Sequence, residues 1–525
     1  MTLVPRRRVR KVMHASRSRR TGFQCRSGDR LGMWSPSVPP PRYARGMDSR
    51  LFVGGEWIGA AGGPTVAIRD AATGEVIADV PHAGELLARE AVDAAARALP
   101  AWRATAAADR AALLQRAARA LRESTPALAA VITAENGKPI AEAEAEVAYS
   151  AAYLDSAAEA VCKVAAEEID SGSTGRSMRA TGEPIGVVAA ISPWNFPLAM
   201  IARKTAPALA AGCTQVIKPS EITPLSALAF AHVLQDAGLP AGVVNVVAGD
   251  APAIGRAWLG DGRVRKLAFT GSTAVGKELM RLAADQVVRL SLELGGHAPL
   301  IVFEDADIPR AVAAALAGKF RCSGQTCICP NRFLVARSVH DEFVAQFVAG
   351  ASALRVGRGS DGANRIGPLI NDAAVEKVRR HIEDAVARGG RVLTGGSTIP
   401  VAGCLDRFFA PTVIDNANAS MLCFNEETFG PVAPIATFDT EDEAIALANA
   451  TEFGLAAYLF TRDPSRIARV SAQLEYGIVG ANTCAVSDAR APFGGVKWSG
   501  FGREGGRWGL DEYLSWKYVC ESRPT

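Results

Sequence analysis

The chain has 525 residues, which is too long for one ordinary hydrophobic core and predicts two or three domains. Hydrophobic residues make up 49% of it and charged residues 21%, which is typical of soluble globular proteins. The longest apolar runs have the length of buried strands. They fall far short of the roughly 18 residues that a membrane span needs, so we expect no membrane segment.

Positive charge is concentrated at the start of the chain. Residues 1–46 hold eleven Arg, one Lys and a single acid, whereas the rest carries more acids than bases. The body of the chain is therefore mildly acidic, and we expect no nucleic-acid-binding face. Residues 1–46 are predicted to be a disordered basic extension that the protein can lose. Their composition fits a transit peptide to the mitochondrial matrix, but translation from Met47 is the simpler interpretation and gives a cytoplasmic protein.

The ten cysteines are scattered, without repeated CxxC pairs or a Cys/His cluster at zinc spacing. Reduced thiols in the cytoplasm are the simplest explanation, and no metal site is expected.

Helix formers come first along the chain, and short apolar runs then alternate with helical stretches. Residues 85–100 and 106–135 are rich in Ala, Glu, Arg and Leu, which favours helices. Six later runs are predicted to be strands: 185–191, 215–217, 243–247, 264–269, 288–292 and 300–302. After residue 330 a second series is predicted, with strands at 333–336 and 391–393 and helices at 373–388 and 441–450. This alternation indicates an α/β protein with parallel, doubly wound sheets, and we expect the motifs below at the carboxyl ends of strands.

Four segments contain residues that could do chemistry. Cys327 lies in a Gly-containing loop after the helical run 311–319, although a single cysteine is more often a buried apolar residue. Asn195 follows one strand in a Pro-Trp-Asn-Phe-Pro segment that opens a helix, and Glu293 ends another strand before Leu-Gly-Gly. The fourth segment, 427–432, reads Glu-Thr-Phe-Gly-Pro-Val. Taken alone, the last three are explained by a helix cap, a solvated strand end and a turn.

In this order the segments resemble the aldehyde dehydrogenase superfamily, over residues 51–520. Further matching stretches are 218–221, 269–272 with Gly276, and 492–497. The resemblance implies two doubly wound α/β domains plus a small β oligomerisation element. The implied division is a dinucleotide-binding domain at 47–166 and 183–294, a catalytic domain at 295–495, and the oligomerisation element at 167–182 and 510–525. Strands of that element that pair with a neighbour imply a homodimer or homotetramer.

The resemblance also implies how an aldehyde would be oxidised. Cys327 attacks the carbonyl carbon, since a thiolate is the best side-chain nucleophile for this step. The side-chain amide of Asn195 and the backbone N–H of Cys327 hold the resulting oxyanion. Glu293 then acts as the general base for the water that hydrolyses the thioester.

Seven residues are carried over from the resemblance as cofactor contacts: Trp194, Lys218, Glu221, Gly271, Ser272, Glu427 and Phe429. Lys218 is expected on the adenosine ribose, Ser272 on the pyrophosphate at a helix N-terminus, and Glu427 on the nicotinamide ribose. The cofactor is NAD or NADP, with NAD preferred because the Glu221 carboxylate would repel a 2′-phosphate. The simpler interpretation is that Glu221 caps the following helix.

Within the superfamily the chain looks most like succinate-semialdehyde dehydrogenases, in stretches 201–204, 319–321, 474–480 and 513–520. In that group two arginines and a serine hold the distal carboxylate of the substrate, and the matching positions are Arg203, Arg321 and Ser487. We expect Arg203 to share one helix with Asn195; taken alone, Arg203 is better explained by an ordinary ion pair. Residues 482–486 depart from the usual pattern and Arg490 adds a cation, so glutarate semialdehyde is the alternative substrate.

Three further possibilities stay open at this stage. A structural or binding protein with a dead site would share this fold, but Cys327, Glu293 and Asn195 are all present. A relative that transfers the acyl group to CoA would not need Glu293 as a base. Cys329, one residue from the nucleophile, is either a small loop residue or the partner of Cys327 in a strained, easily reduced disulfide.

Overall fold

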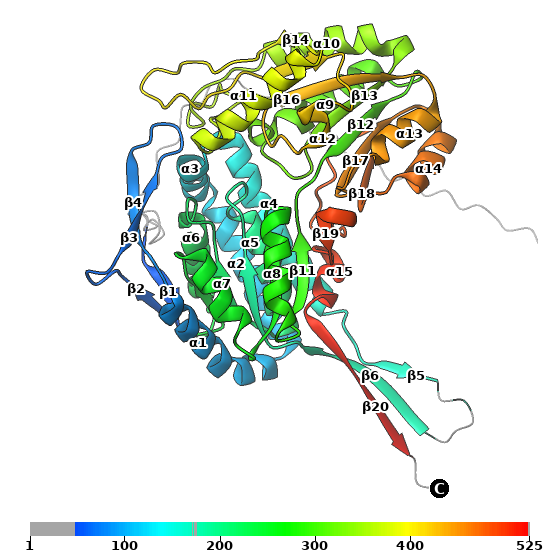
Figure 1. The fold of residues 1–525 in the computed structure, drawn as a ribbon. Coiled ribbons are helices and arrows are strands. Elements are labelled where there is room, and N and C mark those ends of the chain that lie inside the picture. The colour runs from blue at the N-terminus through cyan, green and yellow to red at the C-terminus, as the bar shows by residue number, and fades with distance from the viewer. Residues whose placement is uncertain (1–47, 171, 173–175, 523–525) are drawn as a thin grey trace, which may run out of the picture. The chain divides into compact units, whose positions relative to one another are not determined.

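The computed structural model describes residues 48–170, 172 and 176–522. The extension predicted at residues 1–46 lies outside this range, as do residues 523–525 of the predicted oligomerisation element. Within the described range no helix is long and apolar enough to cross a membrane. The predicted α/β class is confirmed, since two large, mostly parallel sheets organise the chain (Figure 1).

The first sheet has eight strands in the order β19-β11-β10-β7-β8-β9-β1-β2. Its five central strands, β11 to β9 in that order, are parallel. The strands are β1 (Leu51–Val53), β2 (Glu56–Ile58), β7 (Val187–Ile191), β8 (Thr214–Lys218), β9 (Val244–Val246), β10 (Val264–Thr270), β11 (Arg289–Glu293) and β19 (Gly500–Phe501). The chain runs outward from β7 through β8 to β9, then returns beside β7 with β10. The direction of winding therefore reverses between β7 and β10, which is where doubly wound sheets bind ligands.

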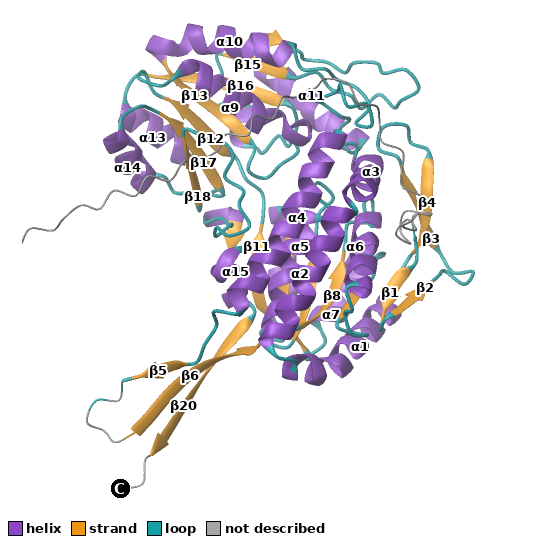
Figure 2. Cartoon of the chain, turned by 180° about the vertical axis from the view of Figure 1, so that it is seen from behind, coloured by secondary structure: helices purple, strands orange, loops and turns teal. Residues whose placement is uncertain are grey.

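Helices cover both faces of this sheet. On one face lie α1 (Glu85–Ala104), α7 (Ala251–Leu259) and α8 (Thr273–Ala284), as Figure 1 shows. The other face carries α2 (Ala107–Glu123), α3 (Thr125–Asn136), α4 (Ile140–Val161), α5 (Ala199–Ala211) and α6 (Leu225–Asp236) (Figure 2). Helix α5 is buried on all sides, so its two charged residues, Arg203 and Lys204, must find partners inside the protein.

Residues 106–135, whose composition favours helices, form two helices, α2 and α3, that meet at Ser124. Pro126 lies in the first turn of α3, where its missing N–H costs nothing, whereas in the middle of one long helix it would remove a backbone hydrogen bond.

The second sheet has seven strands in the order β14-β15-β16-β13-β12-β17-β18, and all but β14 are parallel. The strands are β12 (Ala298–Val302), β13 (Pro330–Ala336), β14 (Arg391–Thr394), β15 (Thr412–Asp415), β16 (Val432–Phe438), β17 (Ala456–Phe460) and β18 (Ile478–Ala481). The helices are α9 (Ile308–Phe320), η2 (Arg321–Gly324), α10 (His340–Ser352), α11 (Asp372–Ala387), α12 (Leu422–Asn425), α13 (Glu441–Asn449) and α14 (Pro464–Gln473). A separate hairpin, β3 (Thr65–Arg69) with β4 (Val76–Pro81), precedes α1.

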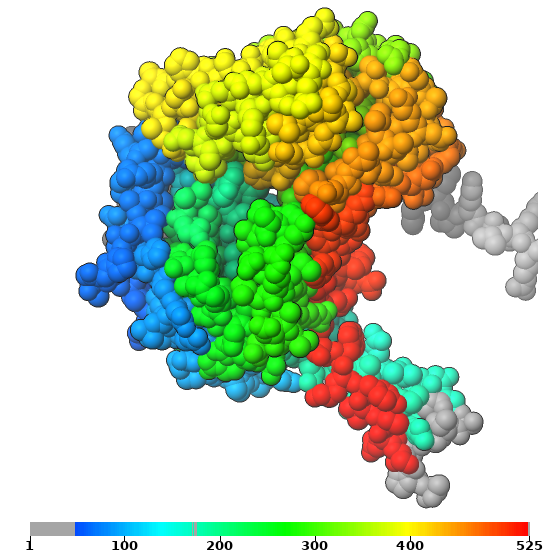
Figure 3. Space-filling model, viewed as in Figure 1, coloured from blue at the N-terminus to red at the C-terminus, as the bar shows by residue number. Residues whose placement is uncertain are grey.

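A three-stranded antiparallel sheet projects from the body as an arm (Figures 1 and 3). It consists of β5 (Glu167–Ile169), β6 (Arg176–Pro184) and β20 (Leu514–Ser522), with β20 paired to β6 along its whole length. The strand predicted from residue 510 begins later, because residues 510–511 close the short helix α15 (Gly506–Asp511). Trp516 and Tyr518 on β20 are largely exposed in the single chain.

Candidate active site

The cavity of the site lies where the two large sheets meet. The chain leaves the first sheet at Glu293 and enters the second at Ala298, and a cavity of about 610 Å³ opens beside this crossing. Asn195, Lys218 and Ser272 lie at carboxyl ends of strands in the first sheet, as predicted. The same expectation is wrong for Cys327, which precedes β13 and so lies at the amino end of a strand in the second sheet.

Cys327 is half-buried and borders the cavity. The turn before it is strained, since Cys322 and Ser323 have φ values of 49° and 56° in the left-handed region. Gly296 lets the loop come close, because a Cβ there would lie 2.2 Å from the carbonyl oxygen of Cys327. Burial raises the pKa of the Cys327 thiol, and the neighbouring Glu293 carboxylate raises it further. The free thiol therefore holds its proton more tightly than an ordinary cysteine does.

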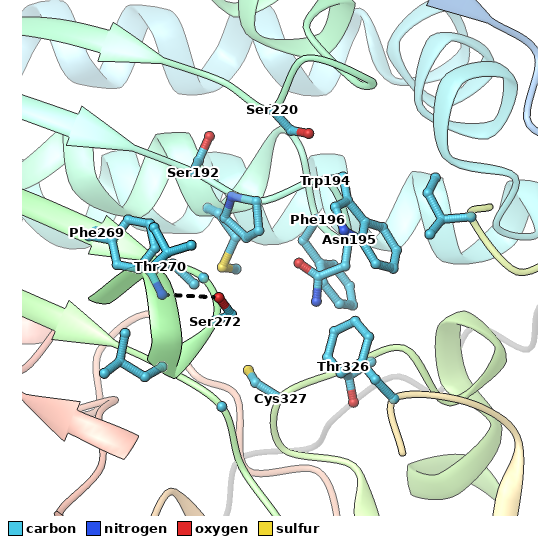
Figure 4. Close-up of a pocket in the computed structure, with 18 of the residues that line it drawn as sticks. Ser192, Trp194, Asn195, Phe196, Ser220, Phe269, Thr270, Ser272, Thr326 and Cys327 are labelled. Atoms are coloured by element: carbon cyan, nitrogen blue, oxygen red, sulfur yellow. Dashed lines mark hydrogen bonds between the residues drawn. The ribbon is translucent and has the colours of Figure 1, made fainter. Parts of the chain in front are cut away.

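The side chain of Asn195 faces Cys327 across the cavity (Figure 4). Its Nδ2 donates a hydrogen bond of 3.0 Å to the carbonyl oxygen of Gln325. An amide nitrogen carries two hydrogens, so this bond fixes the group and leaves a second donor. Asn195 lies in the loop between β7 and α5, so the prediction that it shares a helix with Arg203 is wrong.

Glu293 is buried beside the thiol in a cluster of four charges. Arg203 lies 3.3 Å from Glu293 and is also paired with Glu504, which accepts a hydrogen bond of 2.6 Å from Lys204. Burial raises the pKa of Glu293, against the charge of Arg203. Arg203 therefore forms ion pairs, as the sequence predicts when this arginine is considered alone. Sequence reasoning missed Lys204 and Glu504, although two adjacent cations in an otherwise apolar helix were a signal.

The other end of the cavity has groups suited to a dinucleotide. Lys218 ends β8 and is paired with Glu221, and Ser272 caps α8. Glu221 does not cap α6, whose first amides, at Leu225 and Ser226, are bound by Glu135. A lysine, a carboxylate and a helix N-terminus at the point where the sheet reverses its winding fit ribose hydroxyls and a pyrophosphate.

Glu427, Trp194 and Phe429 also line the cavity. Glu427 accepts a hydrogen bond of 3.0 Å from the backbone N–H of Gly296, and burial raises its pKa to about 7. The Trp194 and Phe429 rings meet edge to face with centroids 5.6 Å apart. Gly271 also borders the cavity, so all seven predicted cofactor residues line one space.

Arg321 and Ser487 border the cavity near Cys327. The guanidinium of Arg321 stacks on the ring of Phe196, 4.6 Å from its centre. Among the described residues Arg203 forms two ion pairs beside the cavity, whereas Arg321 forms none. Tyr149, which the sequence did not single out, also lines the cavity, and its hydroxyl is hydrogen-bonded to that of Tyr153 at 2.6 Å. Arg490 adds no cation to the cavity, because it is exposed and paired with Asp488.

Cys329 points away from the nucleophile. It is fully buried, and its sulfur lies 3.4 Å from Nζ of Lys319, whereas Cys327 borders the cavity. A disulfide between the two cysteines thus needs a rearranged loop, and their pairing stays a prediction.

Comparison with known proteins identifies the family of the chain. The family model described as "Aldehyde dehydrogenase family" matches residues 57–519. A glutarate-semialdehyde dehydrogenase of Pseudomonas putida is 47% identical over 90% of this chain and 98% of its own. A 3-sulfolactaldehyde dehydrogenase of the same species is 48% identical over 90% of this chain and 97% of its own. The crystal structure of succinate-semialdehyde dehydrogenase from Burkholderia pseudomallei has 48% identity and a TM-score of 0.90, covering 93% of this chain and 100% of its own.

The chain belongs to the aldehyde dehydrogenase family. The predicted resemblance, including that to succinate-semialdehyde dehydrogenases, is confirmed. The protein is an NAD(P)-dependent aldehyde dehydrogenase that acts on a small aldehyde.

Proposed function

We propose that the protein oxidises succinate semialdehyde to succinate through a covalent thioester on Cys327. Three features support this mechanism: a thiol next to a buried carboxylate, an amide donor across the cavity, and a cavity that fits a dinucleotide.

In the first half of the reaction Cys327 releases its proton to solvent, and the sulfur, as a thiolate, forms a bond to the aldehyde carbon. The carbonyl electron pair moves to oxygen, where the free N–H of Asn195 and the backbone N–H of Cys327 hold the oxyanion. NAD or NADP, when bound, supplies the hydride acceptor that makes the adduct a thioester. In the second half Glu293 takes a proton from water, the hydroxide adds to the thioester, and the C–S bond breaks to release the carboxylate.

The observation that carries the substrate assignment is the guanidinium of Arg321, which borders the cavity without a carboxylate partner among the described residues. Arg203 is neutralised by Glu504 and Glu293, so Arg321 supplies the net positive charge. Glutarate semialdehyde, 3-sulfolactaldehyde and succinate semialdehyde, which name the three relatives above, each carry a distal anion. An arginine fork with the hydroxyls of Ser487 and Tyr149 beside it suits such a group.

Glutarate semialdehyde, one methylene longer, is the second candidate. A further cavity of about 280 Å³ lies beside Arg321, and small side chains from 483–485 line it. A single methylene discriminates by only about 10- to 200-fold, so the enzyme is expected to turn over both substrates.

Replacing Arg321 by Ala is expected to lower kcat/KM for succinate semialdehyde by about 100-fold or more, because the distal carboxylate loses its charged partner. With butanal, an uncharged aldehyde of the same length, we expect a change of only a few-fold. The measurement is steady-state kinetics with both aldehydes for the wild type and the variant.

Arg310→Ala is the matched control, since Arg310 lies on the same helix, α9, but is exposed and outside the cavity. It should leave both kcat/KM values unchanged. Equal losses on the two aldehydes in Arg321→Ala, or a wild-type preference for butanal, would rule out the substrate assignment and leave the thioester mechanism standing.

We expect NAD to be preferred to NADP. The Glu221 carboxylate lies beside Lys218 at the ribose end of the cavity, where it can accept bonds from ribose hydroxyls and would repel a 2′-phosphate. Glu221→Gln keeps the shape and removes the charge, so the ratio of kcat/KM for NAD over NADP should fall by about tenfold. A wild-type preference for NADP, or an unchanged ratio in the variant, would contradict this role.

The same proposal includes the domain division, assembly and location. Residues 47–166 and 183–294 would form the dinucleotide-binding domain and 295–495 the catalytic domain. The exposed aromatic residues of the arm support pairing with a second copy, in a homodimer or homotetramer. Cytoplasmic location is proposed, or the mitochondrial matrix if residues 1–46 act as a transit peptide.

A further inference from the structure

A buried ion pair holds helix α5 and the loop before it in place. Lys138, between α3 and α4, pairs with Glu146 of α4 at 2.6 Å, and neither side chain is accessible to solvent. Burying two charges is costly unless every donor and acceptor is used. The partners of this pair therefore indicate what it does.

All the other partners of the pair belong to the segment that carries Asn195. Nζ of Lys138 donates a hydrogen bond of 2.6 Å to the carbonyl oxygen of Asn195 itself. It also lies 3.8 Å from the centre of the Phe196 ring, a cation–π contact. The second carboxylate oxygen of Glu146 accepts bonds of 2.9 and 3.1 Å from the backbone N–H groups of Leu198 and Ala199, where α5 begins.

A neighbouring amide completes the support. Asn136, two residues before Lys138, donates a hydrogen bond of 3.0 Å to the carbonyl oxygen of Trp194. The loop from β7 to α5 is thus held at five backbone and ring positions, 194–196 and 198–199, by residues that do not border the cavity.

Helix α4 also contacts the loop that carries the nucleophile. Glu142, on its first turn, accepts a hydrogen bond of 2.8 Å from the backbone N–H of Cys322 in the strained turn before Cys327. One rigid element therefore touches both loops that face each other across the cavity.

We propose that Lys138, paired with Glu146, is a positioning residue that holds the side-chain amide of Asn195 at the distance where it can bind the oxyanion. Lys138 touches neither substrate nor cofactor, and it acts only through the backbone of Asn195. The inference rests on the proposed role of Asn195. A displacement of about 1 Å in such a donor costs up to about 100-fold in rate.

The test is a double-mutant cycle between Lys138→Met and Asn195→Ala, read as the rate of the burst of reduced cofactor in a single turnover. Lys138→Met alone should slow the burst by about 10- to 100-fold. In the Asn195→Ala background, where no amide is left to position, the same change should slow it by less than about twofold. The dissociation constant of NAD, measured by fluorescence titration, should stay within about twofold throughout.

Lys266→Met is the matched control, because Lys266 is an equally buried lysine paired with Glu512 at 3.0 Å outside the cavity. Even if Lys266→Met lowers the Tm, its effect on the burst rate should be the same in the wild-type and Asn195→Ala backgrounds. If Lys138→Met folds poorly, Lys138→Met with Glu146→Gln removes both charges and should show the same dependence on Asn195.

Two results would separate the inference from the proposed function. If Asn195→Ala alone leaves the burst rate unchanged, the proposed oxyanion role of Asn195 is wrong. If Asn195→Ala slows the burst strongly but Lys138→Met slows it equally in both backgrounds, only the positioning role of Lys138 is overturned.

Discussion

Replacing Glu293 by Gln is expected to give an enzyme that produces about one equivalent of reduced cofactor per active site and then almost stops. Losing a general base lowers a rate by about 10²- to 10⁴-fold, and here we expect the loss in the hydrolysis of the thioester. Rapid-mixing absorbance at 340 nm would measure the burst, and mass spectrometry of the intact protein would detect the acyl group on Cys327.

The pH dependence of turnover is part of the same prediction. Burial raises the pKa of Glu293 above its ordinary value of 4.5, and only the deprotonated form accepts a proton from water. Turnover should therefore fall as pH falls through the raised pKa, and this acidic limb should be absent in Glu293→Gln. Glu512→Gln, which changes an acid bound to Lys266 and Ser291 outside the cavity, should keep steady turnover and the acidic limb. A Glu293→Gln enzyme with neither burst nor acyl group would show that Glu293 is needed before the thioester forms.

Cys327→Ala is expected to remove both the burst and steady turnover, lowering kcat/KM by about 10⁴-fold or more. Without the sulfur no covalent adduct forms, and among the described residues that line the cavity Cys327 is the only cysteine. The measurement is dehydrogenase activity together with NAD binding, which should persist because the cofactor contacts are intact.

Cys213→Ala is the matched control for this variant. Cys213 is also buried, but its thiol faces the carbonyl oxygen of Tyr513 at 3.5 Å, away from the cavity. It should retain activity within a few-fold. Activity of Cys327→Ala within tenfold of the wild type would require a different nucleophile and would contradict the thioester mechanism.

The positions of residues at the ends of strands could be predicted from the sequence. Lys218 and Glu293 each follow an apolar run that becomes a buried strand, and parallel strands end at a common edge. Periodicity therefore placed these residues near one another. The strand before Asn195 was placed equally well, but the helix after it begins only at Ala199, since helix boundaries depend on backbone partners far away in the sequence, here the carboxylate of Glu146.

The buried charges were not predictable in this way. Glu504 is about 300 residues from Arg203 and Lys204, and no periodic pattern joins them. In the sequence, Lys138 resembles an ordinary surface lysine between two helices, and only the fold shows that it is buried. Unpaired charges cannot stay inside a protein, so a lysine or glutamate among alanines was a usable signal, but its partner could come only from the structure.

The cluster of Arg203, Lys204, Glu293 and Glu504 holds two positive and two negative charges, and this balance sets the timing of proton release in the proposed reaction. The charges of Cys327 and Glu293 are coupled, since an anion on either raises the pKa of the other. While Cys327 is a thiolate, its charge keeps the proton on Glu293. Acylation of the sulfur removes that charge, and the pKa of Glu293 is then raised only by burial and by Glu504, and lowered by Arg203 and Lys204. The carboxyl group becomes more acidic and releases its proton, so the base for water is regenerated only once there is a thioester for water to attack.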